Sequence, residues 1–122
     1  IKLGARSVVA LDTDPLAVKA TRSNLKVNAV GNEVILGQGT LPHAKVPDQT
    51  FDIAIANISA KTVLEQTQNL LSTLLPGGFL LVSGMIEERV QEVTSHIKEF
   101  GASLECHAIE GDWNAILFKA KP

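Results

Sequence analysis

The sequence has a single cysteine, Cys106, and no run of basic residues. One cysteine excludes an internal disulfide framework and a cysteine-rich zinc site, and it favours the reducing cytoplasm as the location of the protein. The formal net charge of -2 and the scattered lysines and arginines argue against direct binding to nucleic acid, which requires clustered basic side chains. No apolar stretch is long enough to span a bilayer, so no membrane contact is expected.

With 45% hydrophobic and 20% charged residues among 122, the chain has the composition of one globular domain or part of one. Four short apolar segments predict strands that are covered on both faces; they lie at residues 7–11, 34–36, 51–56 and 79–83. Residues 38–49 are predicted to form a loop. The segments 103–109 and 115–119 alternate between apolar and polar residues, which predicts an antiparallel hairpin around Gly111 and Asp112.

Three stretches of the chain have helical signals. Asp14 is a suitable N-cap for a first helix that starts at Pro15 and runs to about residue 28. We expect Gly31 to close this helix. Its buried side is predicted to contain Leu16, Ala20 and Val27.

The second helix has the strongest periodicity in the chain. Its apolar positions recur every three or four residues: Val63, Leu64, Thr67, Leu70, Leu71, Leu74 and Leu75. We expect the segment Pro76-Gly77-Gly78 to stop it. The third helix, which ends at Gly101, has apolar residues at Ile86, Val90, Val93, Ile97 and Phe100. The order of elements predicts an α/β fold with a doubly wound, mostly parallel sheet and an antiparallel C-terminal hairpin.

In open α/β sheets, ligands bind beyond the carboxyl ends of the strands. Three polar points lie there: Asp12, Asn57 and the pair Ser83-Gly84. A carboxylate that ends the second strand of a nucleotide-binding fold can accept hydrogen bonds from both ribose hydroxyls. Alternatively, Asp12 only shapes the turn before the first helix. We favour the ribose role because Asp14 already provides the helix cap.

The glycine-rich loop that binds a nucleotide precedes such an acidic residue by about 20 residues. Counting back from Asp12 places this loop before Ile1. We therefore expect an upstream strand, a Gly-x-Gly turn and a helix that ends near Gly4. In this topology the upstream strand lies between the strands that end at Asp12 and Asn57, so without it a gap or a rearranged strand pairing is expected.

The segments VVALDTDPLAVKATRSNLKVNAV, FDIAIANISA and LLPGGFLLVSGM, with the later pair Asp112-Trp113, carry a family resemblance. In combination they resemble the class I S-adenosylmethionine-dependent methyltransferases, and within these the ribosomal protein L11 methyltransferase family. The resemblance covers nearly the whole chain. It implies a Rossmann-like fold, S-adenosyl-L-methionine (AdoMet) as cofactor, and lysine or terminal amines of ribosomal protein L11 as methyl acceptors.

By position in the motifs, the resemblance makes Asp12 the ribose-binding acid and Asn57 the residue that contacts the cofactor and faces the methyl-transfer centre. Residues 1–122 would then form part of the catalytic domain, without its first strand, its glycine loop and the separate N-terminal substrate domain. This chain alone is expected to be inactive. Two alternatives remain open: a non-catalytic fragment that binds no cofactor, and an NAD-type Rossmann oxidoreductase.

The chemistry of an amide supports a catalytic role for Asn57, because its oxygen can accept a hydrogen bond from an incoming amine and orient the lone pair. The alternative is an asparagine that only caps a loop. Ile58 and Ser59 are candidates for the acceptor entrance. No carboxylate occurs at Gln38-Gly39, so the adenine contact is unassigned.

The remaining polar candidates have structural interpretations. No pair of histidines has metal-ligand spacing, and surface positions are expected for all three: His43, His96 and His107. No metal site is predicted, and Cys106 has no neighbour that would make it a nucleophile. We favour Trp113 as an anchor of the hairpin in the core over a cover for the site.

Overall fold

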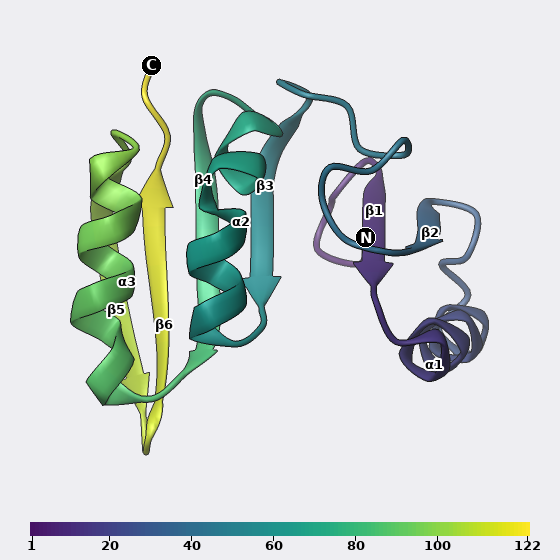
Figure 1. Ribbon diagram of the computed structural model, residues 1–122. Coiled ribbons are helices and arrows are strands. Elements are labelled where there is room, and N and C mark those ends of the chain that lie inside the picture. Colours follow the sequence, from purple (N-terminus) through teal and green to yellow (C-terminus); the bar gives the residue numbers. More distant parts are fainter. The chain divides into compact units, whose positions relative to one another are not determined.

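The computed structural model describes all residues 1–122, which divide into two compact units (Figure 1). The first unit comprises Ile1–Pro47 and the second Asp48–Pro122. Strand pairing follows the same division, with a two-stranded sheet in the first unit and a four-stranded sheet in the second. None of the helices is long and apolar enough to cross a membrane.

The first unit is a β-α-β motif of β1 (Val8–Asp12), α1 (Pro15–Val27) and β2 (Val34–Gln38). The two strands are parallel and in register from Val8 opposite Val34 to Asp12 opposite Gln38. Strand β2 is two residues longer than expected, which places Gln38 in the strand instead of the loop. As the sequence predicts, α1 starts at Pro15, with the Asp14 carboxylate accepting a hydrogen bond from the backbone N–H of Leu16 at 2.8 Å.

The buried side of α1 is not the predicted one. Leu16 and Val27 are 73% and 85% exposed, and Ala20 is exposed as well. The buried residue is Val18, with Leu25 half-buried on the same side. The helix has two apolar stripes on opposite sides, both with helical spacing, so periodicity alone could not choose between them. The residues of β1 are likewise half-buried or exposed, not buried on both faces.

The first helix closes two residues earlier than predicted, at Ala29 instead of Gly31. Ala29 has a left-handed backbone with φ of 55°. Its N–H donates to the Lys26 carbonyl at 3.1 Å, and the N–H of Val30 donates to the Leu25 carbonyl at 3.1 Å. These two bonds form a Schellman motif, in which the left-handed position usually carries glycine.

The second unit has the chain order β3 (Phe51–Asn57), α2 (Ala60–Ser72), β4 (Leu74–Met85), α3 (Glu87–Glu99), β5 (Ser103–Glu110) and β6 (Trp113–Lys119). The strand order in the sheet is β3-β4-β6-β5, with β3 parallel to β4 and the other pairs antiparallel. The mixed α/β fold with an antiparallel C-terminal hairpin is therefore confirmed.

Helices α2 and α3 lie on the same face of the four-stranded sheet (Figure 1). The core is between these helices and the sheet. Its fully buried side chains are Val63, Thr67, Leu80, Val82, Met85, Val93, Ile97, Ile116 and Phe118. On β3, Ala56 is buried on this side, whereas Ile53 and Ile55 alternate with it and are 57% and 67% exposed.

Helix α2 ends before the predicted Pro-Gly-Gly stop. The carbonyl of Ser72 accepts a hydrogen bond from the N–H of Gln49, and the carbonyl of Thr73 accepts from Thr50 and Phe51. These bonds bring the chain into the sheet, so that Leu74 pairs with Phe51 and belongs to β4. The pair after Phe51 with Leu74 is Ile53 with Phe79. The segment Pro76-Gly77-Gly78 lies between these two pairs and consequently forms a bulge within β4.

The left-handed closure of α1 gives a prediction about stability. Ala29→Gly should raise the free energy of unfolding by about 0.5–1 kcal/mol, because relief of the left-handed backbone exceeds the entropic cost of glycine. Equilibrium urea unfolding measures the change. Asn28, at φ of -86°, is right-handed, so Asn28→Gly should change the stability in the opposite direction. An Ala29→Gly protein of unchanged or lower stability would contradict the assignment of the helix end.

Candidate functional site

The polar residues singled out by the sequence do lie at carboxyl ends of parallel strands. In the first unit Asp12 ends β1 and is paired with Gln38, the last residue of β2. In the second unit Asn57 ends β3 and is paired with Ser83 of β4. Each parallel pair therefore presents two polar side chains at one edge of its sheet. Asp12 and Asn57 belong to different units of the chain.

The carboxylate of Asp12 is exposed, and one of its two oxygens is already hydrogen-bonded within the chain. Its Oδ1 accepts a hydrogen bond from the backbone N–H of Asp14 at 2.9 Å, which tightens the turn into α1. The turn-shaping role that the sequence left open is thus present. A carboxylate has two oxygens with about four acceptor positions, so Asp12 can shape this turn and still bind a diol.

The loop after β2 is ordered by a histidine whose role the sequence did not indicate. His43 is half-buried, not on the surface, and its Nδ1 accepts a hydrogen bond from the N–H of Lys45 at 3.1 Å. Its Nε2–H donates to the Gln38 carbonyl at 3.2 Å. The ring lies close to Gly37 and Gly39, where a Cβ would come within 3.1 Å of it. In the sequence, only the glycines on either side of Gln38 indicated this close packing.

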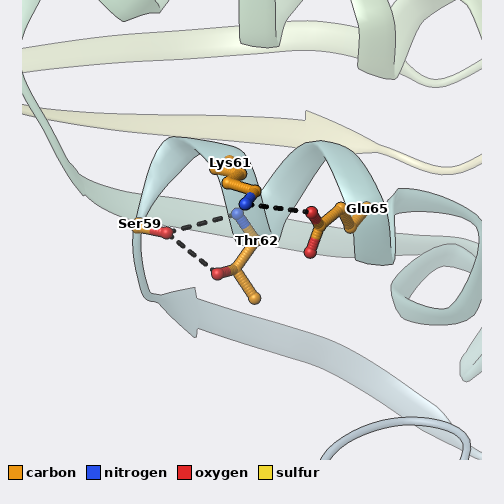
Figure 2. A network of polar contacts seen from close by, with 4 residues as sticks. All are labelled: Ser59, Lys61, Thr62 and Glu65. Carbon is orange, nitrogen blue, oxygen red and sulfur yellow. Dashed lines mark hydrogen bonds and ion pairs between the residues drawn. The ribbon is translucent and has the colours of Figure 1, made fainter.

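Asn57 is exposed, and its carboxamide takes part in no hydrogen bond within the structure. The chain after it is fixed by Ser59, the N-cap of α2, whose Oγ accepts from the N–H of Thr62 at 3.2 Å. Figure 2 shows this cap with the Ser59–Thr62 hydroxyl contact at 2.8 Å and the ion pair of Lys61 with Glu65 in the first turns of α2. Since the cap sets where α2 begins, it limits the strand-to-helix turn at Asn57 to two residues.

Ile58 and Ser59, the candidates for an acceptor entrance, therefore differ in role. Ser59 is used as the helix cap. Ile58 is 39% exposed, so its side chain remains available to a ligand at this edge.

On the neighbouring strand, Ser83 is followed by Gly84, a residue with φ of +84°. The register of β4 against β6 shifts here, because Ser83 pairs with Ala115 and Met85 pairs with Asn114. Gly84 is the extra residue of a β-bulge. A Cβ at this position would lie 2.6 Å from Oδ1 of Asn57. The candidate site of the second unit is thus Asn57 beside a bulged glycine.

The hairpin is anchored by Asn114, not by Trp113 as expected. Trp113 is 61% exposed, whereas Asn114 is 2% exposed. The Asn114 Oδ1 accepts from Nε2–H of His107 at 2.6 Å, and its Nδ2 donates to the Met85 carbonyl at 3.5 Å. The Asn114 carboxamide can donate to the bulged backbone and accept from His107 at the same time, whereas an indole has a donor but no acceptor.

The other histidine and the acidic residues have structural roles. His96 is half-buried, not on the surface; its Nε2–H donates to the Leu64 carbonyl at 3.1 Å and so joins α3 to α2. Glu87 and Glu88 lie in the first turn of α3, where negative charge suits the helix dipole. Cys106 is a free, exposed thiol on β5. No cluster of three or more His, Cys, Asp or Glu side chains is placed to hold a metal ion.

Comparison with known proteins places the whole chain in one family. A family model described as ribosomal protein L11 methyltransferase (PrmA) matches residues 1–121. The ribosomal protein L11 methyltransferase of Geobacter metallireducens is 37% identical over 120 residues, which are 98% of this chain and 38% of that protein. The protein of that name from Clostridium botulinum (strain Eklund 17B) is 38% identical over 120 residues, or 37% of its length. The chain thus spans well under half the length of these relatives.

Solved structures of methyltransferases also superpose on this chain. The ribosomal protein L11 methylase of Lactobacillus delbrueckii subsp. bulgaricus superposes with a TM-score of 0.88 at 26% identity, over 99% of this chain and 62% of that one. A methyltransferase from Pyrococcus furiosus has a TM-score of 0.78 at 19% identity, over 95% and 64%, which shows a shared fold. The expected Rossmann-like class I methyltransferase fold is confirmed, and the chain belongs to the ribosomal protein L11 methyltransferase family.

Proposed function

We propose that this chain is part of the catalytic domain of an AdoMet-dependent protein N-methyltransferase that methylates amino groups of ribosomal protein L11. The observation that carries the proposal, in a chain of this family, is the polar residue at the carboxyl end of a parallel strand in each unit: Asp12 ends β1, and Asn57 ends β3 next to Gly84. The names of the relatives support the substrate. A cytoplasmic location stays a prediction that fits a ribosomal substrate.

The residues present fit the ribose of such a cofactor. Asp12 is exposed and retains acceptor positions on the carboxylate oxygen that the Asp14 N–H does not use. The backbone N–H of Gly39 donates to the Asp12 carbonyl at 2.9 Å, which holds the β2 end beside the acid. Asp12 would therefore hold the ribose, and no residue is assigned to the adenine.

The proposed catalytic residue is Asn57. AdoMet, when bound, supplies a methyl group on a positively charged sulfur. A neutral amine needs only alignment to accept it, so a site without a strong base is sufficient. The free carboxamide oxygen of Asn57 would accept one N–H of the amine and so direct its lone pair. The Ser59 cap and the pairing of β3 with β4 restrict the backbone on both sides of this amide.

We further propose that residues 1–122 are completed in the whole protein by the first strand, the glycine loop and a substrate-recognition domain. β1 pairs only with β2 and β3 only with β4, so each has one unpaired edge. The face of the sheet away from α2 and α3 exposes Ile53 and Ile55. Unpaired edges and exposed apolar faces are features that proteins normally cover. The fraction of the relatives that the chain matches supports the same proposal.

The two alternatives are less well supported. All the relatives and structures compared above are methyltransferases, which does not favour an NAD-type oxidoreductase. A non-catalytic fragment that binds no cofactor is distinguished from the enzyme by activity of the whole protein.

The proposed function is tested by methyl transfer. The full-length protein should incorporate labelled methyl groups from AdoMet into purified L11, and Asn57→Ala should lower kcat by about 100-fold, the effect expected when a reacting amine loses its alignment. Asn69→Ala, on the far part of α2, is the matched control and should retain activity. Absence of transfer by the wild-type protein would overturn the proposal.

A second prediction concerns the cofactor alone. Asp12→Ala in the full-length protein should weaken AdoMet binding by about 1.5–3 kcal/mol, through loss of charge-assisted hydrogen bonds. Asp12→Asn retains an Oδ1 acceptor for the Asp14 N–H but removes the charge, so it should preserve the turn and still weaken binding. Isothermal titration calorimetry measures both; wild-type affinity in the two variants would refute the ribose assignment.

A third prediction concerns the edge of β3. If a further strand pairs with it in the whole protein, consecutive backbone amides from Ile53 to Ala56 should all exchange slowly with solvent, because both edges are hydrogen-bonded. Amide-resolved hydrogen exchange measures this. Fast exchange at alternate residues would show that the edge is unpaired there and would contradict the proposed completion of the sheet.

A further inference from the structure

We propose that Gly84 is a positioning residue for Asn57: the bulge at Gly84 provides the space in which the Asn57 carboxamide lies. The proposal deepens the function proposed above and rests on it for its catalytic consequence. The effect of position 84 on the Asn57 side chain is independent of that function, since it concerns only the conformation of one side chain.

The side chain of Asn57 lies very close to the backbone of Gly84. Asn57 pairs with Ser83 across β3 and β4, which brings its side chain against the next residue of β4. A Cβ at Gly84 would lie 2.6 Å from Asn57 Oδ1 and 3.7 Å from its Cγ. Carbon–oxygen contacts under about 3 Å are strongly repulsive, whereas dispersion attraction is best at about 3.5–4 Å. Any side chain at position 84 must therefore displace the Asn57 carboxamide.

The displaced atom is at the end of a flexible side chain, not part of the backbone. Of the three atoms nearest to that Cβ, the one outside Asn57 is the Ile58 carbonyl oxygen at 3.5 Å, an ordinary contact. The carboxamide takes part in no hydrogen bond that would hold it against such a push. A methyl group at position 84 should therefore leave the fold intact and move the Asn57 amide.

The bulge itself is fixed from the opposite side of β4. The buried Asn114 of β6 donates to the carbonyl of Met85, and its own Oδ1 is bonded to His107. Met85 is 2% exposed and follows the bulge directly. Gly84 thus lies between a buried anchor on one side and Asn57 on the other, which limits how far its backbone can shift to accommodate a larger residue.

Strand β4 contains two further glycines that serve as matched controls. Gly77 also has a left-handed backbone, with φ of +75°, but a Cβ there would meet only Cε of Lys119 at 3.8 Å. Gly77→Ala therefore reproduces the backbone strain of Gly84→Ala without a close contact. At Gly78 a Cβ would lie 2.9 Å from the Leu75 carbonyl oxygen and 3.0 Å from that of Asp52. Gly78→Ala should therefore damage the fold itself.

The experiment compares these variants in the full-length protein. The side-chain amide resonance of Asn57, assigned by its loss in Asn57→Ala, should shift in Gly84→Ala and stay in place in Gly77→Ala. In the methylation assay Gly84→Ala should lower kcat about 10- to 100-fold more than Gly77→Ala, the effect expected from a misplacement of about 1 Å. The melting temperature of Gly84→Ala should fall no further than that of Gly77→Ala, whereas Gly78→Ala should lower it most.

A double variant separates positioning from a general structural effect. In an Asn57→Ala background no Oδ1 remains to be displaced, so adding Gly84→Ala should reduce kcat only as much as adding Gly77→Ala does. Full additivity would overturn the proposal, as would an unmoved Asn57 resonance in Gly84→Ala. If the wild-type protein does not methylate L11, the proposed function fails, but the resonance shift and the melting temperatures still decide the role of Gly84.

Discussion

The parallel pairing of β3 with β4 determines where the candidate site residues of the second unit lie. Its register ends with Asn57 beside Ser83, so the last polar residue of one strand meets the bulge of the other. Parallel strands present their carboxyl ends at one edge, and at that edge backbone groups and side chains are free to contact a ligand. The cap at Ser59 and the anchor at Asn114 hold the two strand ends from outside the pair. The first unit repeats the arrangement with Asp12 beside Gln38.

Much of this architecture could be predicted from the sequence because it depends on local signals. The N-cap at Asp14, the end of β3 at Asn57 and the Gly111-Asp112 hairpin follow from residue types that favour one conformation. The site candidates Asp12 and Asn57 followed from their positions at strand ends, and their roles were sharpened by a family resemblance. The comparisons confirm the family and the fold, whereas the roles of the two residues remain proposals.

The features that the sequence could not predict depend on contacts between distant residues. Leu74 continues the helical spacing of α2, but hydrogen bonds from residues 49–51 to the helix end draw it into β4. Trp113 has the size of an anchor, yet the buried anchor is Asn114, because the partner that needs a hydrogen bond is on another strand. For α1, two apolar stripes had equal periodicity. The importance of Gly84 was hidden because its neighbour, Asn57, is 27 positions away.

We propose that the carboxyl ends of β1 and β3 hold the cofactor and align the acceptor amine, and a crystal structure of the whole protein with AdoMet bound tests this proposal. The account predicts that a carboxylate oxygen of Asp12 lies within hydrogen-bond distance, about 2.5–3.0 Å, of a ribose hydroxyl. It also predicts the Asn57 carboxamide against Gly84 and beside the sulfonium methyl. A cofactor bound away from either residue would contradict the account.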